Sequence, residues 1–158
     1  MENDEHLGLE MGRALTAKVA AEELPFYDEL TTAAQEAHNK GGDHTLGFGG
    51  STELLAAAAP ILFEIGKTIV EFIWHQAQAS IGELAKDAAK EFQTRLRERI
   101  LSWIDRHFQQ SPPVTVTPGA LEELIETIKK DAAAKGLGEP ELTRLTVVVA
   151  RAFGQTRV

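Results

Sequence analysis

Residues 51–110 read STELLAAAAPILFEIGKTIVEFIWHQAQASIGELAKDAAKEFQTRLRERILSWIDRHFQQ, and this stretch decides the fold of the chain. Its apolar residues recur every three or four positions, which places them along one face of a helix. The pattern predicts an all-α protein, a helical bundle built on a long kinked or broken central helix at about 51–110. The face consists of Leu54, Ala58, Ile61, Ile65, Ile69, Phe72 or Ile73, Ala77, Ile81, Leu84, Ala88, Phe92, Leu96, Ile100, Ile104 and Phe108.

The length of this segment requires either a break or a partner. One unbroken helix of this length would extend about 90 Å at ~1.5 Å per residue, whereas a compact domain of this size has a radius of gyration of about 15 Å. The candidate breaks are Pro60, Gly66 and the region 80–82. Because proline disfavours helix at the preceding residue and glycine weakens a helix, we predict a kink at Pro60 and a turn near Gly82. Helices at 60–79 and 82–109 would result.

The N-terminal third predicts two shorter helices followed by a loop. The first would begin after Asn3, which is a favourable N-cap, and the second at Pro25, which suits a first helical position. The loop GGDHTLGFGGS, residues 41–51, contains five glycines, so Gly47, Gly49 and Gly50 are hinge candidates together with Pro60 and Gly82. The first helix would pack through Leu7, Met11, Leu15 and Val19, with Gly8 and Gly12 interrupting it, and the second through Phe26, Leu30, Ala33 and Ala37.

The C-terminal third predicts a helical hairpin at 117–154, tethered by a proline-rich linker at 111–116 to a bundle at 1–110. Thr117 is an N-cap and Pro118 a first helical residue, while Gly136 ends the helix and lets Leu137 fold back onto Ala132. A last helix would start at Pro140. The alternative for Val147–Val149 is a strand paired with 114–117, because β-branched residues favour strands. The hairpin belongs either to a separate subdomain or to the same domain.

Composition and charge limit the function classes. The chain has 158 residues, no cysteine and a formal net charge of −8. Residues 1–44 carry ten acids and three bases, which accounts for −7 of this charge and disfavours nucleic acid as a partner. The longest uncharged apolar run, 54–63, is half the roughly 20 residues that a membrane span needs. Without an apolar signal segment or disulfide framework, we expect a cytoplasmic protein.

The sequence contains no strong catalytic, cofactor or metal motif. His38, Asp43 and His44 flank the glycine loop, but a metal site needs three or four convergent ligands at defined spacing. The loop also lacks the Gly-Lys-Ser/Thr ending of a phosphate-binding loop. The cluster Arg95, Arg97, Arg99 and Arg106 is diluted by Glu98 and Asp105. We therefore expect no enzyme activity, cofactor or metal, and no nucleic-acid partner.

Two hypotheses about function follow. The first is a non-enzymatic module for protein–protein interaction or self-assembly, in which the apolar face of 54–108 contacts a partner or, as we expect, a second copy. The alternative is a membrane-active helical effector, pore-forming or membrane-disrupting, that uses 54–74, because this segment is apolar on more than one side. The contact candidates in both are Leu54, Ile61, Phe63, Ile65, Ile69, Phe72, Ile73 and Trp74.

Overall fold

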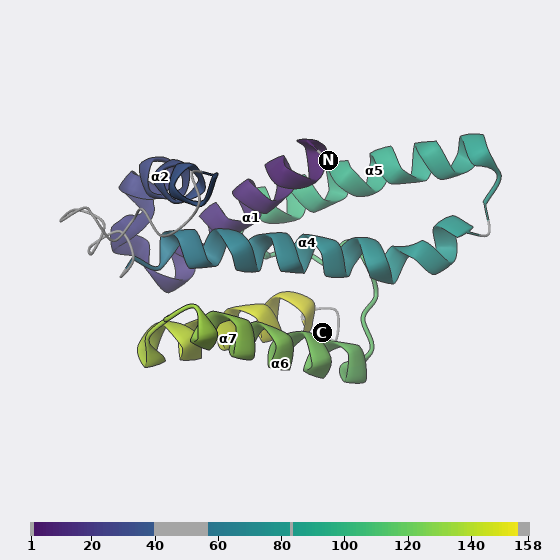
Figure 1. Cartoon of the computed structure of the whole chain (residues 1–158). Helices are drawn as coiled ribbons and strands as arrows, with labels where there is room; N and C mark the ends of the chain where they lie inside the picture. The colour runs from purple at the N-terminus through teal and green to yellow at the C-terminus, as the bar shows by residue number, and fades with distance from the viewer. Residues whose placement is uncertain (1, 40–56, 83, 155–158) are drawn as a thin grey trace.

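The computed structural model describes residues 2–39, 57–82 and 84–154, and in this part of the chain the protein is all-α, as predicted. A central helix lies between two layers (Figure 1). On one side are the helices formed by residues 2–39 and the helix of residues 86–105, and on the other side is the C-terminal hairpin. The elements are α1 (Glu2–Val19), η1 (a 3-10 helix, Ala21–Phe26), α2 (Tyr27–Asn39), the central α4 (Ala59–Gly82), α5 (Lys86–Asp105), α6 (Pro118–Ala134) and α7 (Glu139–Gly154).

The start of α4 is set by a carboxylate from a distant part of the chain. Glu23 in η1 accepts hydrogen bonds from the backbone N–H groups of Ala58, at 2.9 Å, and Ala59, at 2.7 Å. The first amides of a helix have no partner inside it, and the helix dipole favours a negative charge there. Pro60 lies in the first turn, where a missing N–H costs nothing. The predicted kink at Pro60 is therefore not a bend inside α4, because α4 begins at Ala59.

The central segment folds back at the second predicted break. Helix α4 continues through Gly66 to Gly82, and α5 begins at Lys86 and returns alongside (Figure 1). The two helices differ from the predicted ranges, since α4 is longer at both ends and α5 stops at Asp105 instead of 109. The hinge candidates Gly47, Gly49 and Gly50 lie outside the described residues.

Helix α5 ends in a Schellman cap without glycine. The N–H of His107 donates to the carbonyl of Ile104 at 2.9 Å, and that of Phe108 donates to Trp103 at 2.9 Å. Both residues have positive φ, 54° for His107 and 67° for Phe108. This conformation is unfavourable for residues with a Cβ. The ring of Phe108 is buried against that of Trp103, with centroids 4.8 Å apart, which is the apolar contact that accompanies this cap.

Helices α1 and α4 approach each other closely through glycine. A Cβ on Gly12 would stand 2.7 Å from the Cα of Phe63, and one on Gly66 would stand 2.7 Å from the carbonyl oxygen of Gly8. Gly8 and Gly12 were expected to interrupt the apolar face of α1, and Gly66 to be a candidate break. They instead allow the two backbones to touch. The predicted apolar residues of α1, namely Leu7, Met11, Leu15 and Val19, are all buried.

The second predicted helix has a different inner face from the one expected. Pro25 lies in η1 rather than at the start of an α-helix, and the change from 3-10 to α geometry at Tyr27 rotates the side chains. Phe26, predicted as part of the apolar face, is 55% exposed, whereas Tyr27 is fully buried. Regular helical spacing cannot predict this change, because it assumes a single geometry across Pro25.

The C-terminal hairpin forms as predicted. The hydroxyl of Thr117 accepts from the N–H of Ala120 at 3.1 Å, and Gly136 has φ of 98°. The N–H of Leu137 then donates to Ala132 at 3.0 Å. Val147–Val149 are helical, so the strand alternative is wrong.

The hairpin also shares its core with the rest of the bundle. Its buried residues belong to the same apolar cluster as those of α1, α4 and α5. Arg144 of α7 donates to the carbonyl of Val19 at the end of α1, at 3.1 Å. Pro112 and Pro113, in the predicted linker, are buried. The division at 111–116 into two domains stays a prediction.

Candidate functional site

Most of the contact candidates on the central segment are core residues. Five have between 0% and 8% of their surface exposed, namely Ile61, Phe63, Ile65, Ile69 and Ile73. Phe72 and Trp74 are half-buried, and Phe72 packs edge-on against Phe153 of α7 with ring centroids 5.8 Å apart. Leu54 lies outside the described residues. In this conformation the chain's own helices therefore cover the apolar face of α4.

The apolar face of α5 is covered over only half its length. Leu96, Ile100 and Ile104 are buried, but Ala88 is exposed and Leu84, just before the helix, is 40% exposed. The sequence predicted a continuous inner face, and this is wrong for the first turns of α5. The joined ends of α4 and α5 extend beyond the N-terminus of α1, so α1 does not cover them (Figure 1).

The exposed side of α5 is divided into an apolar part and a basic part. Arg95, Arg99 and Arg106 are exposed and follow one another at intervals of four and seven residues, so they lie along one face of the helix. Ser102 lies on the same face, and Ala88 continues it toward the start of the helix. We call Ala88, Arg95, Arg99, Ser102 and Arg106 the outer line of α5.

Arg97, which the sequence grouped with the other arginines, does not belong to the outer line. It is half-buried, and its guanidinium carbon lies 5.8 Å from the centre of the Trp74 ring on α4. An arginine stacked on an indole contributes a cation–π contact and covers apolar surface with its stem. Arg97 therefore joins α5 to α4, while the other three arginines are available at the surface.

Two open hollows lie beside the basic part of the outer line. The first has a volume of about 320 Å³ and the second about 420 Å³, and Gln110 lines both. The amide of Gln110 donates to the hydroxyl of Ser102 at 3.2 Å, and this hydrogen bond holds the Gln110 side chain between the two hollows. The first is lined by Arg95, Glu98, Arg99, Ser102, Gln110, Ser111 and Pro113, and the second by Lys18, Arg106, His107, Gln109 and Gln110.

A row of acidic residues runs next to the outer line. Asp87, Glu91, Glu98 and Asp105 are exposed and lie on the neighbouring side of α5. Glu91 accepts a hydrogen bond from Arg95 at 2.7 Å, which is a favourable i,i+4 pair on a helix, but both side chains are more than 60% exposed. Such an exposed pair contributes little stability. The alternation of charge suits a partner with localised carboxylates better than a uniform polyanion.

A second charged surface, which is acidic, lies on η1 and α2. Residues 21–39 contain five acids and no lysine or arginine. Glu23 is occupied as the cap of α4, and Asp28 accepts a hydrogen bond from Arg13 at 2.8 Å. The remaining Glu22, Glu29 and Glu36 are exposed at intervals of seven residues. Phe26 lies exposed among them.

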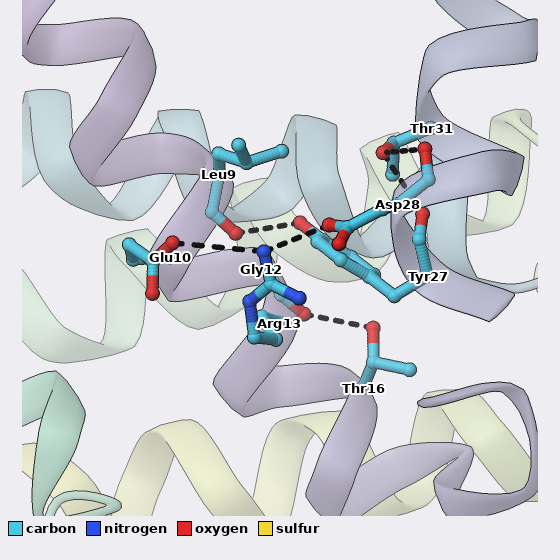
Figure 2. Close-up of polar contacts among 8 residues, drawn as sticks. All are labelled: Leu9, Glu10, Gly12, Arg13, Thr16, Tyr27, Asp28 and Thr31. Carbon is cyan, nitrogen blue, oxygen red and sulfur yellow. Dashed lines mark hydrogen bonds and ion pairs between the residues drawn. The ribbon is translucent and has the colours of Figure 1, made fainter. Parts of the chain in front are cut away.

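The most enclosed polar cluster joins α1 to α2 (Figure 2). The hydroxyl of Tyr27 donates to the carbonyl of Leu9 at 2.7 Å, and the guanidinium carbon of Arg13 lies 5.0 Å from the centre of the tyrosine ring. Burial raises the pKa of Tyr27 well above its usual value, and the hydrogen bond to Asp28 raises the pKa of Arg13.

A phenol that stays protonated is neither a base nor a nucleophile at neutral pH, so this cluster holds α2 in place. Sequence reasoning missed it, since no spacing rule pairs Leu9 with Tyr27.

The histidines and acidic residues considered as metal ligands do not lie close together in the described part of the chain. His6, His75 and His107 are exposed. No three His, Asp or Glu residues among those described are placed to bind a metal ion. Asp43 and His44 lie outside the described residues. None of the described helices is long and apolar enough to cross a membrane.

Comparison of the chain with protein-family models, curated proteins and solved structures gives no match.

Proposed function

We propose that this chain is a non-enzymatic helical interaction module that self-associates through the outer line of α5. The observation that carries this proposal is the surface of α5, whose first turns expose apolar residues and whose later turns expose Arg95, Arg99 and Arg106 along one face. Aromatic and arginine side chains are enriched where proteins bind each other, and an exposed apolar patch beside charged residues is typical of such surfaces.

The fold directs the proposal to this part of the long segment. The apolar residues of α4, the first candidates from sequence, are already in contact with α1, α6 and α7. Leu84 and Ala88 are the part of the predicted apolar face that stays exposed in the described residues. A second copy that covers them would complete the burial that the sequence pattern predicts.

The test is the concentration dependence of molecular mass, measured by sedimentation velocity and light scattering from 1 to 200 µM, as an order-of-magnitude range around common dimer affinities. Ala88→Glu places a charge in the centre of the apolar part of the surface. We expect it to weaken self-association at least about ten-fold, equivalent to ~1.4 kcal/mol.

The matched control is Gln93→Glu, which changes the net charge equally at an exposed position on another face of the same helix. We expect this variant to associate as the wild type does. A wild-type chain that stays monomeric over the whole range contradicts the proposal. Equal weakening by both variants would assign the effect to net charge and not to this surface.

The second candidate function is the membrane-active reading, supported by the burial of α4 from several sides. Ile61, Leu62 and Phe63 are consecutive and all buried, so neighbouring elements cover this part of α4 on more than one side, while Glu64 keeps 44% of its side chain exposed. Release of such a helix from its neighbours would present it to a lipid surface, where it would lie in the interface. Leakage from anionic vesicles at pH 5 to 7.5 tests this reading, and the absence of both leakage and vesicle binding contradicts it.

A further inference from the structure

We infer that the basic part of the outer line of α5, at Arg99 and Arg106, is occupied by the exposed acidic face of η1 and α2 from a second copy of this chain. The acidic face consists of Glu22, Phe26, Glu29 and Glu36. This inference rests on the proposed self-association and specifies which surface of the second copy makes the contact. It is carried by the charge and the spacing of the two surfaces.

Two carboxylates of the acidic face have no ion-pair partner among the residues that the structure describes. Glu29 and Glu36 are exposed and take part in no ion pair within the described residues. They lie seven residues apart on α2, and no lysine or arginine occurs between residues 21 and 39 to neutralise them. Phe26, at the same face, is 55% exposed, although a large apolar side chain usually contributes to a core.

The basic surface offers matching cations. Arg99 and Arg106 are exposed, also lie seven residues apart, and likewise form no ion pair within the described residues. Lys18 adds a positive charge, and His107 adds an imidazole, at the hollow next to Arg106. Arg95 is already paired with Glu91, so Arg99 and Arg106 are the arginines of the outer line that a partner's carboxylates can bind.

The spacing of the two surfaces fits an antiparallel arrangement of α2 against α5. Seven helical residues span about 10.5 Å on either helix, at 1.5 Å per residue. If Glu36 faces Arg99, Glu29 faces Arg106. The same direction carries Phe26, in η1, past the C-terminal end of α5, where Gln109 lines the hollow of about 420 Å³.

A parallel arrangement would instead pair Glu29 with Arg99 and Glu36 with Arg106, and would direct Glu22 toward the half-buried Phe92. Both arrangements pair carboxylates with arginines, but the antiparallel one directs the aromatic ring toward a recess.

Two further expectations follow from an interface of exposed ion pairs around one aromatic ring. Self-association weakens steeply with salt, because pairs at the rim of an interface are screened. It also does not require the surface of α2 to be acidic or that of α5 to be basic, only that the two surfaces carry opposite charges. Reversal of the charges on both surfaces should therefore preserve binding.

A charge-exchange experiment tests the inference. Variant one carries Arg99→Glu and Arg106→Glu, and variant two carries Glu29→Arg and Glu36→Arg, all at exposed positions. Each variant alone is expected to self-associate at least ten-fold more weakly than the wild type in sedimentation velocity. An equimolar mixture is expected to recover association, because the acidic α2 of variant one meets the basic α5 of variant two, and the reversed pair also attracts.

The control variants reverse the same number of charges on α6. They are Lys129→Glu with Lys130→Glu, and Glu122→Arg with Glu126→Arg, all exposed. These are expected to self-associate as the wild type does. Circular dichroism verifies that each variant is folded. If a reversed variant is not folded, the neutral variants Arg99→Gln with Arg106→Gln and Glu29→Gln with Glu36→Gln replace it, and each must weaken association.

The possible outcomes separate this inference from the proposed function. If the wild type associates and the charge-reversed variants associate equally well, the pairing of α2 with α5 is overturned. The same holds if the mixture of the two variants stays monomeric. In either case the protein self-associates through another contact. A monomeric wild type overturns both. A monomeric wild type that binds vesicles of anionic lipid through Arg99 and Arg106 would assign the outer line of α5 to a membrane surface instead.

Discussion

Gly12 of α1 and Gly66 of α4 face each other so closely that a Cβ on Gly66 would stand 2.7 Å from the backbone nitrogen of Gly12. This contact is between two backbones, and neither can move without moving its helix. The glycine seam therefore fixes the distance between α1 and α4, and with it the burial of Leu7, Met11 and Leu15.

We expect Gly66→Ala to destabilise the protein by roughly 2 kcal/mol or more, because the added methyl group forces the helices apart and overpacking of this kind costs about 1–3 kcal/mol. Glycine-to-alanine changes inside an exposed helix have the opposite sign, about 0.5–1 kcal/mol in favour of alanine. The measurement is the free energy of unfolding from urea denaturation.

Gly119 provides the control for this change. It lies in the first turn of α6, and no atom lies within 4 Å of a Cβ built on it. Gly119→Ala should leave the free energy of unfolding unchanged or raise it slightly. Similar losses in both variants would show that the seam between α1 and α4 is not the cause.

Glu23 caps a helix that begins more than thirty residues later in the chain. We expect Glu23→Ala to lower the free energy of unfolding by about 1–2 kcal/mol, because two backbone donors at the start of α4 lose a charged acceptor. Glu22→Ala removes the same charge from the preceding residue, which is exposed. The difference between the two variants in the free energy of unfolding, measured by urea denaturation, gives the contribution of the cap. Equal losses in both variants would contradict the capping role of Glu23.

Tyr27 is the chain's one tyrosine, so the absorbance of tyrosinate reports on this side chain alone. Burial raises its pKa in the folded state above the value of about 10 in the unfolded chain. The contribution of Tyr27 to the free energy of unfolding is therefore fully present below about pH 10. It is lost as the pH rises further, because the tyrosine ionises readily only in the unfolded chain. We expect little tyrosinate absorbance at pH 10.5 until the protein unfolds.

Tyr27→Phe separates this effect from the ionisation of lysine in the same pH range. The variant loses the hydrogen bond to Leu9 and about 0.5–1.5 kcal/mol at pH 7. Its free energy of unfolding should then fall less than that of the wild type between pH 9 and 11. Ready titration of the folded wild type near pH 10 would contradict the burial argument.

Local rules predict the ends of the C-terminal hairpin because each depends on neighbouring residues. Thr117 caps, Gly136 adopts positive φ and Leu137 folds back, and all three follow from signals within a few residues. The fold class likewise follows from the helical period of 51–110. The turn near Gly82 follows from the mismatch between helix length and domain size.

The sequence does not predict which neighbour covers which part of a face. Gly66 has the same local signature as a helix break, and only the position of α1 makes it a contact. Arg97 and Arg99 are two residues apart, but one stacks on Trp74 and the other faces solvent. The candidate interaction surface depends on this distinction, which requires the arrangement of α4 and α5 in space.

The cap of α5 gives a last prediction, because His107 and Phe108 share a positive φ but differ in burial. His107 is exposed, so His107→Gly removes backbone strain of about 1–2 kcal/mol without loss of packing. The greater entropy of glycine in the unfolded chain offsets about 0.5–1 kcal/mol of this gain. We therefore expect the free energy of unfolding to rise by up to about 1 kcal/mol.

Phe108→Gly relieves the same strain but removes a ring that is packed 4.8 Å from that of Trp103. Loss of a buried phenylalanine costs about 3–5 kcal/mol, so this variant should be clearly less stable. Urea denaturation of the two variants, followed by tryptophan fluorescence, gives effects of opposite sign if the cap is formed as described. A loss of stability in His107→Gly would show that the histidine side chain contributes more than its backbone conformation costs.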